Sequence, residues 1–217
     1  MAESAPEGPT ESEVQAVAWS DVPRIAWLLT RALAADPSQR FFLPCPGLCE
    51  ILLYEGVLRE AADSRAKAGL AQSACGRSAA AWMLPGRSKP SWIGRVLTIT
   101  APIGFLLQVA IVPHRLPRLW RFTQWMLKER PKEPHAYLVA LGTHADWRRR
   151  GLASGVVRAM LRECDREGHP AFLFASTPEN VRFYEGMGFE VASRHEIPGG
   201  PRVCAMLREA RGGEASC

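Results

Sequence analysis

The chain has 217 residues, of which 47% are hydrophobic and 23% charged, and this apolar content excludes a chain that is disordered throughout. The length is enough for one sizeable core and does not require two domains. The formal net charge of +5 is compatible with an anionic ligand or with nucleic acid, and it favours neither.

The two ends of the chain are predicted to be disordered tails, at 1–12 and 210–217, around a single domain at 13–209. Residues 1–12 are acidic and lack the basic and apolar regions of a signal or transit peptide, so we expect a cytoplasmic protein. The six cysteines are irregularly spaced, which argues against a disulfide framework. Cys45 and Cys49 have no second pair and no nearby histidine, so no metal site is expected.

The first half of the chain predicts three strands and two helices. Capping side chains and a proline stand at the start of the first helix, whose apolar residues recur at steps of three and four. Two apolar runs joined by Cys75-Gly76-Arg77 predict a hairpin. In chain order, these elements are a strand at 14–19, a helix ending near Leu33, a helix at about 48–68, and strands at 70–74 and 79–84.

The middle of the chain contains an uncharged run at 96–112. A membrane-spanning helix needs about 20 apolar residues, and this shorter run is interrupted by Pro102 and Gly104. We therefore expect a buried or pocket-covering helical segment, broken at the proline, rather than a membrane span. The surrounding region 92–129 is predicted to be helical.

The last third predicts a strand–helix–strand unit with parallel strands. Residues 136–143 and 171–175 are almost wholly apolar, as in strands covered on both faces. The helix between them has apolar residues at helical spacing from Leu152 to Cys164 and a glycine stop at Gly168. A short helix after Thr177-Pro178 and strands at 189–195 and 202–207 follow. The fold class is mixed α/β.

The loop before the long helix is a candidate anion site. Helix N-termini present unpaired N–H groups to anions, and the small residues Gly151 and Ala153 allow close approach of a phosphate. The neighbouring run Arg148–Arg150 suits a polyanion such as a pyrophosphate. The sequence contains neither the motif of a phosphate-transferring P-loop nor the dinucleotide-binding fingerprint. The alternative is an arginine-coated surface turn.

A second candidate site lies on the next helix. Asn180 and Tyr184 stand four residues apart and therefore on one helical face, just after the end of a predicted parallel strand. That edge of an α/β sheet is where ligands bind. The alternative is a tyrosine that only packs in the core.

Together these motifs resemble the GNAT acetyltransferases. Arg148-x-x-Gly151-x-Ala153 is similar to their acetyl-CoA motif, and Asn180…Phe183-Tyr184…Gly188-Phe189 is similar to their N-x-x-F-Y-x-x-x-G-F pattern. Residues 130–207 resemble the puromycin N-acetyltransferase group most. The resemblance implies a largely antiparallel, twisted sheet of about six to seven strands, flanked by helices around a central βαβ unit.

The resemblance also implies a role for each matching residue. Asn180 would steady acetyl-CoA near its thioester, and Tyr184 would protonate the departing thiolate. Backbone groups of Leu141 and Thr143 would bind the pantetheine arm. The pyrophosphate would be held by N–H groups of the turn and first helical residues, namely Arg149, Arg150, Gly151, Leu152, Ala153 and Ser154. The residues considered for the general base are His114, Glu133, His135 and His144.

The favoured function is therefore transfer of an acetyl group from acetyl-CoA to a primary amine of a small molecule, including a hydrophobic or antibiotic-like amine. The apolar stretch at 92–125 is predicted to contribute to the acceptor pocket. One alternative keeps the fold and acts on a protein N-terminus or a lysine. The other is a basic nucleic-acid-binding module without catalysis. As an enzyme, the protein would be a monomer or homodimer without nucleic-acid or membrane partners.

Overall fold

The computed structural model describes residues 14–17, 19–42, 51, 54, 58, 70–73, 75–85, 116–197 and 199–212. The predicted tail at 1–12 and the uncharged run at 96–112 lie outside these residues, as do most of the predicted helix at 48–68 and most of the tail at 210–217. Ile51, Tyr54 and Leu58 are described within that helix, and each is helical. No helix in the described part of the chain has the length and apolarity to cross a membrane.

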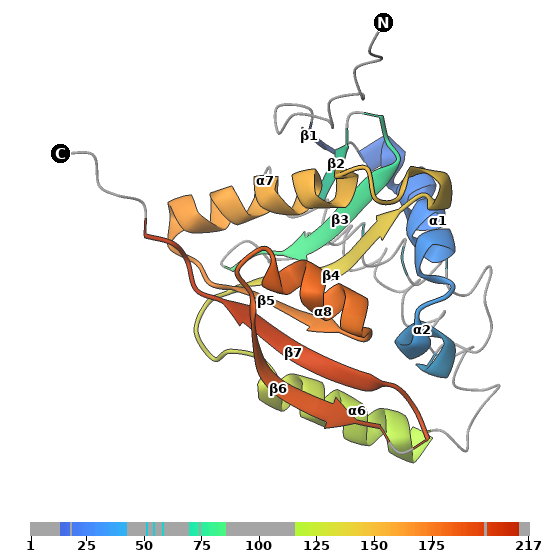
Figure 1. Cartoon of the computed structure of the whole chain (residues 1–217), viewed down its shortest axis with the longest axis vertical. Coiled ribbons are helices and arrows are strands. Elements are labelled where there is room, and N and C mark those ends of the chain that lie inside the picture. Colours follow the sequence, from blue (N-terminus) through green and yellow to red (C-terminus); the bar gives the residue numbers. More distant parts are fainter. Residues whose placement is uncertain are drawn as a thin grey trace, which may run out of the picture.

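One sheet runs through the molecule with the strand order β1-β2-β3-β4-β5-β7-β6 (Figure 1). The β4–β5 pair is parallel and every other neighbouring pair is antiparallel, which confirms the predicted class of a mixed α/β fold with a largely antiparallel sheet and a βαβ unit. The strands are β1 (Val14–Ala16), β2 (Leu70–Ser73), β3 (Ser78–Met83), β4 (Ala136–Thr143), β5 (Ala171–Ala175), β6 (Glu190–Glu196) and β7 (Arg202–Arg208).

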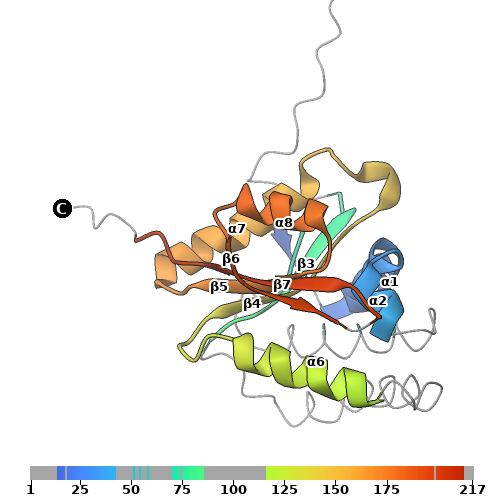
Figure 2. The same ribbon diagram turned by 60° about the horizontal axis from the view of Figure 1, so that its bottom comes forward.

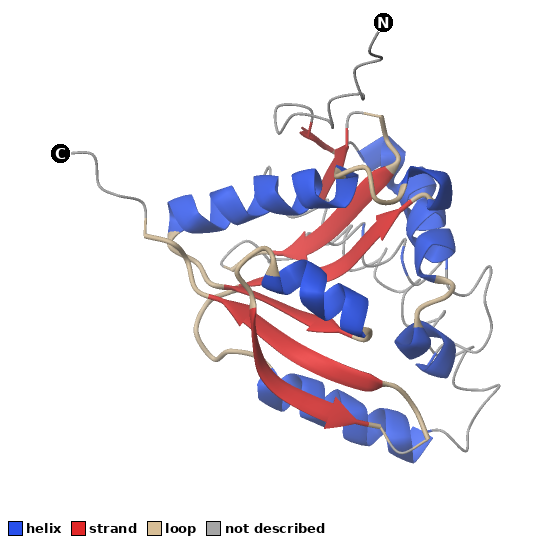
Figure 3. Ribbon diagram, viewed as in Figure 1, coloured by secondary structure: helices blue, strands red, loops and turns tan. Residues whose placement is uncertain are grey.

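Helices cover both faces of this sheet (Figures 2 and 3). Helix α7 packs on Ala80 and Trp82, whereas α1 packs on Ala79 and Ala81. Because successive residues of a strand point to opposite faces, these two helices lie on opposite sides of the sheet. Helix α8 shares the side of α7, and α6 lies on the other side. The helices are α1 (Val22–Leu33), α2 (Pro37–Phe42), α6 (Leu116–Glu129), α7 (Leu152–Glu167) and α8 (Pro178–Glu185).

Most predicted boundaries agree with the structure, and β4 and β5 agree at both ends. The predicted first strand is too long. It ends at Ala16 because Trp19–Asp21 form a short 3-10 turn that leads directly into α1. The predicted proline in the first turn of α1 is Pro23, where the missing N–H breaks no helical hydrogen bond.

Strand β4 changes its register and loses its parallel neighbour at the same point. Between the cross-strand pairs Ala81–Ala140 and Trp82–Leu138, β4 carries one additional residue, Val139. Pairing with β5 ends at Leu138–Leu173. A bulge bends its strand, so the last five residues of β4 diverge from β5 and leave one edge without a strand partner among the described residues.

Helix α1 approaches the diverging end of β4 closely. A methyl group added at Gly142 would lie 2.8 Å from Leu29 Cδ2 and 2.9 Å from Ala32 Cβ. Only glycine therefore fits at this strand position without moving the helix. The contact brings the end of α1, and the loop that follows it, to the divergence of β4 from β5.

The C-terminal end of the described chain is attached to α7 by an ion pair. Arg208 is 5% exposed and donates to both carboxylate oxygens of Asp165, at 2.7 and 2.8 Å. The backbone N–H of Arg211 donates to the same carboxylate at 2.8 Å. The hydrogen bonds from Arg208 hold the pKa of Asp165 below its usual value.

We predict that Asp165→Ala lowers the free energy of unfolding by about 3 kcal/mol, because it leaves a buried guanidinium without its partner. Since the pKa of Asp165 is lowered in the folded state, this stabilisation is complete above about pH 4 and is lost as the pH falls through the folded-state pKa. Chemical denaturation at several pH values measures it. Arg166→Ala, which removes an exposed ion pair from the same helix, is the control with a smaller effect. An equal effect of both variants would contradict the prediction.

Candidate active site

A cavity of about 1070 Å³ opens where β4 diverges from β5. Its wall is formed by the end of α1, the last residues of β4, the turn before α7, the first turn of α7, and α8. We call it the main cavity. All ten site residues predicted from the sequence line it, namely Leu141, Thr143, Arg149, Arg150, Gly151, Leu152, Ala153, Ser154, Asn180 and Tyr184.

The turn before α7 presents unpaired N–H groups to this cavity. Arg149 and Gly151 both have left-handed backbone angles, with φ of 59° and 78°. The N-cap has no side-chain hydrogen bond, and the first helical bond runs from the Gly155 N–H to the Gly151 carbonyl. In the described part of the chain, the N–H groups of residues 152–154 donate no hydrogen bond. This geometry suits an anion.

The three arginines of this turn have different environments. Arg148 is exposed, and its guanidinium donates to the Ala32 carbonyl at 2.9 Å and reaches the Thr143 carbonyl at 3.5 Å. The guanidinium of Arg150 lies 4.8 Å from the ring centre of Trp147. Arg149 is exposed and forms no hydrogen bond or ion pair with any described residue. Arg148 therefore fixes the turn, and Arg149 remains available to a ligand.

The free edge of β4 forms a second wall. Leu141 and Thr143 are paired with β3 on one side, opposite Ala80 and Ser78, and have no β5 partner on the other. The Thr143 hydroxyl lies 2.9 Å from the Ser78 hydroxyl, which also donates to the Gly142 carbonyl at 3.2 Å. Unpaired strand edges accept extended ligands as an additional strand.

Helix α8 places Asn180 and Tyr184 on the cavity wall. Its N-cap is Thr177, whose hydroxyl accepts a hydrogen bond from the Asn180 N–H at 3.2 Å, and Pro178 occupies the first turn. The cap and proline predicted from the sequence are thus confirmed. Asn180 is exposed, one helical turn from Tyr184.

Tyr184 is both a core residue and a cavity residue. It is 8% exposed, and its ring packs edge-on against Phe183 and Phe189. It also lines the main cavity. Burial raises its pKa, and the negative charge of Asp36 raises it further. A tyrosine with its ordinary pKa is already neutral at physiological pH, and this shift holds the proton on the phenol more firmly.

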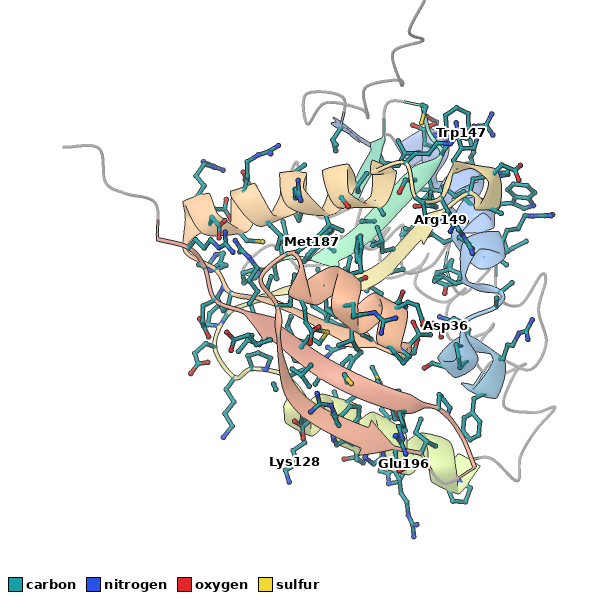
Figure 4. All side chains as sticks on the ribbon, in the orientation of Figure 1. Asp36, Lys128, Trp147, Arg149, Met187 and Glu196 are labelled. Atoms are coloured by element: carbon teal, nitrogen blue, oxygen red, sulfur yellow. The ribbon has the colours of Figure 1, made fainter. Side chains whose placement is uncertain are left out.

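One residue that the sequence did not indicate also lies here. Asp36 follows α1 and lines the main cavity, and its carboxylate accepts a hydrogen bond from the Ser176 hydroxyl. The dipeptide Asp36-Pro37 is a recognisable helix-start signal, but its proximity to Tyr184 depends on the fold. Figure 4 shows Asp36 between α2 and α8.

The residues considered for the general base lie elsewhere. Glu133 and His135 line a separate, shallow cavity at the start of β4 that shares no lining residue with the main cavity. His144 does not line the main cavity, and its Nδ1 lies 3.6 Å from the Asp146 carboxylate. His114 lies outside the described residues. Glu133, His135 and His144 are therefore poorly placed to act beside Tyr184.

Known proteins share parts of this sequence and this fold. The family model of the FR47-like proteins matches residues 119–197. The structure of histone acetyltransferase HPA2 and related acetyltransferase from Corynebacterium glutamicum is 17% identical, with a TM-score of 0.64 over 96% of this chain and 99% of that chain.

Two other solved structures are similar at 12% identity. The ribosomal-protein-S18-alanine N-acetyltransferase of Escherichia coli has a TM-score of 0.53 over 94% of this chain and 97% of its own. An N-acetyltransferase of Staphylococcus aureus Mu50 has a TM-score of 0.52 over 89% and 98%. The chain thus shares the fold of these acetyltransferases, and the comparisons do not confirm the puromycin-like subgroup.

We predict that Gly151→Ala weakens coenzyme A binding about tenfold. An alanine there meets no atom within 4 Å, so the substitution acts by straining the left-handed backbone, at about 1 kcal/mol, and by placing a methyl group where the anion approaches. Calorimetric titration with coenzyme A measures the affinity, and coenzyme A, unlike free phosphate at equal ionic strength, should raise the melting temperature of the wild type.

Gly168→Ala is the matched control, because Gly168 has a φ of 70°, also meets no atom within 4 Å, and lies at the other end of α7. Gly168→Ala should lower the free energy of unfolding about as much as Gly151→Ala does, and its affinity for coenzyme A should stay within about twofold of the wild-type value. An affinity that falls equally in both variants, or in neither, would exclude the turn as the phosphate site.

Proposed function

We propose that this protein is an acetyltransferase that moves the acetyl group of acetyl-CoA to a primary amine. The observation that carries the proposal is that one cavity joins the unpaired N–H groups of the α7 turn to the neutral phenol of Tyr184. If the arginine turn were only a surface turn, or if Tyr184 were sealed in the core, the two would not line the same cavity. The proposal thus favours an enzyme over a nucleic-acid-binding module.

The residues on the wall fit the parts of acetyl-CoA in order. The N–H groups of residues 149–154 would hold the pyrophosphate, with Arg149 supplying an unpaired charge. The free edge of β4 at Leu141 and Thr143 would pair with the amides of the pantetheine arm. Asn180 and Tyr184 then lie near the thioester. The volume of about 1070 Å³ leaves room for an extended ligand of this kind.

The reaction would form a carbon–nitrogen bond to the acetyl carbonyl and break its carbon–sulfur bond. Acetyl-CoA supplies an activated acyl group, and the nitrogen supplies the attacking electron pair. The proton that the nitrogen loses balances the proton that the leaving thiolate gains. Because the pKa of a phenol lies above that of a thiol and is raised further in Tyr184, this residue would chiefly donate a hydrogen bond to the sulfur as negative charge develops there.

The acceptor we favour is a small-molecule amine, including a hydrophobic one, as the resemblance of residues 130–207 to the puromycin N-acetyltransferase group suggests. A second candidate acceptor is the N-terminus of a protein. It is favoured by the similarity in fold to the Escherichia coli enzyme, whose name specifies an alanine of a ribosomal protein. Both acceptors use the same cavity and the same chemistry.

A panel of acceptors should separate these candidates. We predict that acetyl-CoA and small primary amines release free thiol faster than acetyl-CoA and short peptides with free N-terminal alanine or serine. Thiol release with a colorimetric reagent measures the rates, and mass spectrometry of the products confirms the added acetyl group. Faster transfer to the peptides would move the assignment to a protein acetyltransferase, and no transfer to any amine would refute the proposed function.

We predict that Tyr184→Phe lowers kcat at least about a hundredfold, because it removes the donor that faces the leaving sulfur. Coenzyme A affinity should change little, since the ring and its packing remain. Tyr137→Phe is the control, because Tyr137 is a half-buried tyrosine that lines the separate cavity at the start of β4. Full activity in Tyr184→Phe would remove the phenol from the mechanism.

A further inference from the structure

A second cavity adjoins the main cavity beside Tyr184. It has a volume of about 790 Å³, lies between α8 and strands β6 and β7, and shares Pro37 and Thr177 with the wall of the main cavity. Ser176 lines the second cavity and Asp36 lines the main one. The hydrogen bond between these two side chains therefore stands where the cavities meet.

The Asp36 carboxylate is held rigidly at this junction. One oxygen accepts hydrogen bonds from the Ser38 and Gln39 N–H groups, at 2.9 and 3.2 Å, and the other accepts from the Ser176 hydroxyl. These donors fix its orientation without neutralising its charge. No arginine, lysine or histidine of the described residues forms an ion pair with it. A carboxylate on a cavity wall with no paired cation favours a cationic ligand.

The charges on the main cavity wall come from two regions. The arginines at 148–150 and the exposed Asp146 lie at the turn before α7, whereas Asp36 and Glu179 lie toward α8. Glu179 is paired with Arg182 at 3.4 Å, so Asp36 supplies the unpaired negative charge at the end occupied by Tyr184. Its influence on that phenol is visible in the raised pKa of Tyr184.

We propose that Asp36 binds the nitrogen of the acceptor, which reaches the junction of the two cavities as an ammonium ion and releases one proton to solvent before its electron pair attacks the acetyl carbonyl. This inference rests on the proposed acetyl transfer and specifies its substrate class as amines that are cationic at neutral pH, such as alkylamines, rather than neutral arylamines. Ser176 and the first amides of α2 position the carboxylate. The acetyl group would enter from the main cavity. The second cavity is lined by Arg182, Arg194, Arg202 and His195 as well as Glu196, so the ammonium ion is assigned to the Asp36 wall of the main cavity.

The test compares n-butylamine with 1-butanol, which has a similar shape and no charge. Asparagine is as good an N-cap as aspartate, and its amide can donate to the Ser176 oxygen, so Asp36→Asn removes the charge and keeps the hydrogen bonds. The matched control is Glu179→Gln, which neutralises the other acidic residue at this end of the wall. Ligand-observed NMR titrations, with and without coenzyme A, give the two affinities for each protein.

We expect the wild type and Glu179→Gln to bind n-butylamine at least about tenfold more tightly than 1-butanol, and Asp36→Asn to lose this preference. In steady-state assays Asp36→Asn should raise the KM for the amine by a similar factor and leave the KM for acetyl-CoA unchanged. Thermal denaturation of Asp36→Asn checks that the fold is retained.

Several results would overturn the inference. They are equal binding of the two probes by the wild type, no binding of n-butylamine by the wild type, or an amine preference that survives in Asp36→Asn. The outcome is separable from that of the proposed function. If the preference depends on Asp36 and no acetyl transfer occurs, the ammonium site stands and the acetyltransferase proposal fails. If acetyl transfer occurs and the preference does not depend on Asp36, the acetyltransferase proposal stands and the ammonium site at Asp36 is refuted.

Discussion

The divergence of β4 from β5 is the constraint on which the site depends. Two parallel strands that stayed paired to their ends would close the sheet, and no ligand could reach the backbone between them. Here an additional residue, Val139, bends β4 at the point where its pairing with β5 stops. The backbone groups of the last five residues of β4 on that side are thereby left for a ligand.

The neighbouring elements turn this opening into a cavity with two different ends. Gly142 lets α1 approach the strand, and Arg148 attaches the turn before α7 to the last turn of α1 through the Ala32 carbonyl. The positive end thus consists of backbone N–H groups and arginines. On the other side, the loop after α1 brings the carboxylate of Asp36 next to α8. An anionic cofactor at the turn and a cationic acceptor at Asp36 would thus share the cavity that Tyr184 lines.

The sequence predicted those parts of the fold that depend on neighbouring residues. The apolar runs at 136–143 and 171–175, the Gly168 stop and the Thr177-Pro178 start all act locally, and the structure has them where they were predicted. The bulge at Val139 was not predictable, because valine inside an apolar run fits regular and bulged strands equally well. The same holds for the end of the first strand, which is set by the turn into α1.

Asp36 and Tyr184 show which properties of the site residues can be predicted from neighbouring residues in the sequence and which cannot. Asp36 reads as a helix cap in the sequence, and it is one in the structure. Its second carboxylate oxygen meets Ser176, which is 140 positions away, and only the complete sheet brings the two together. Tyr184 was open to two interpretations, core residue or cavity residue, and both are correct. A phenol is neutral at neutral pH in any case, and burial of its ring and the charge of Asp36 both raise the pKa of Tyr184 further. The neutral phenol is the form that can donate a hydrogen bond to a leaving sulfur.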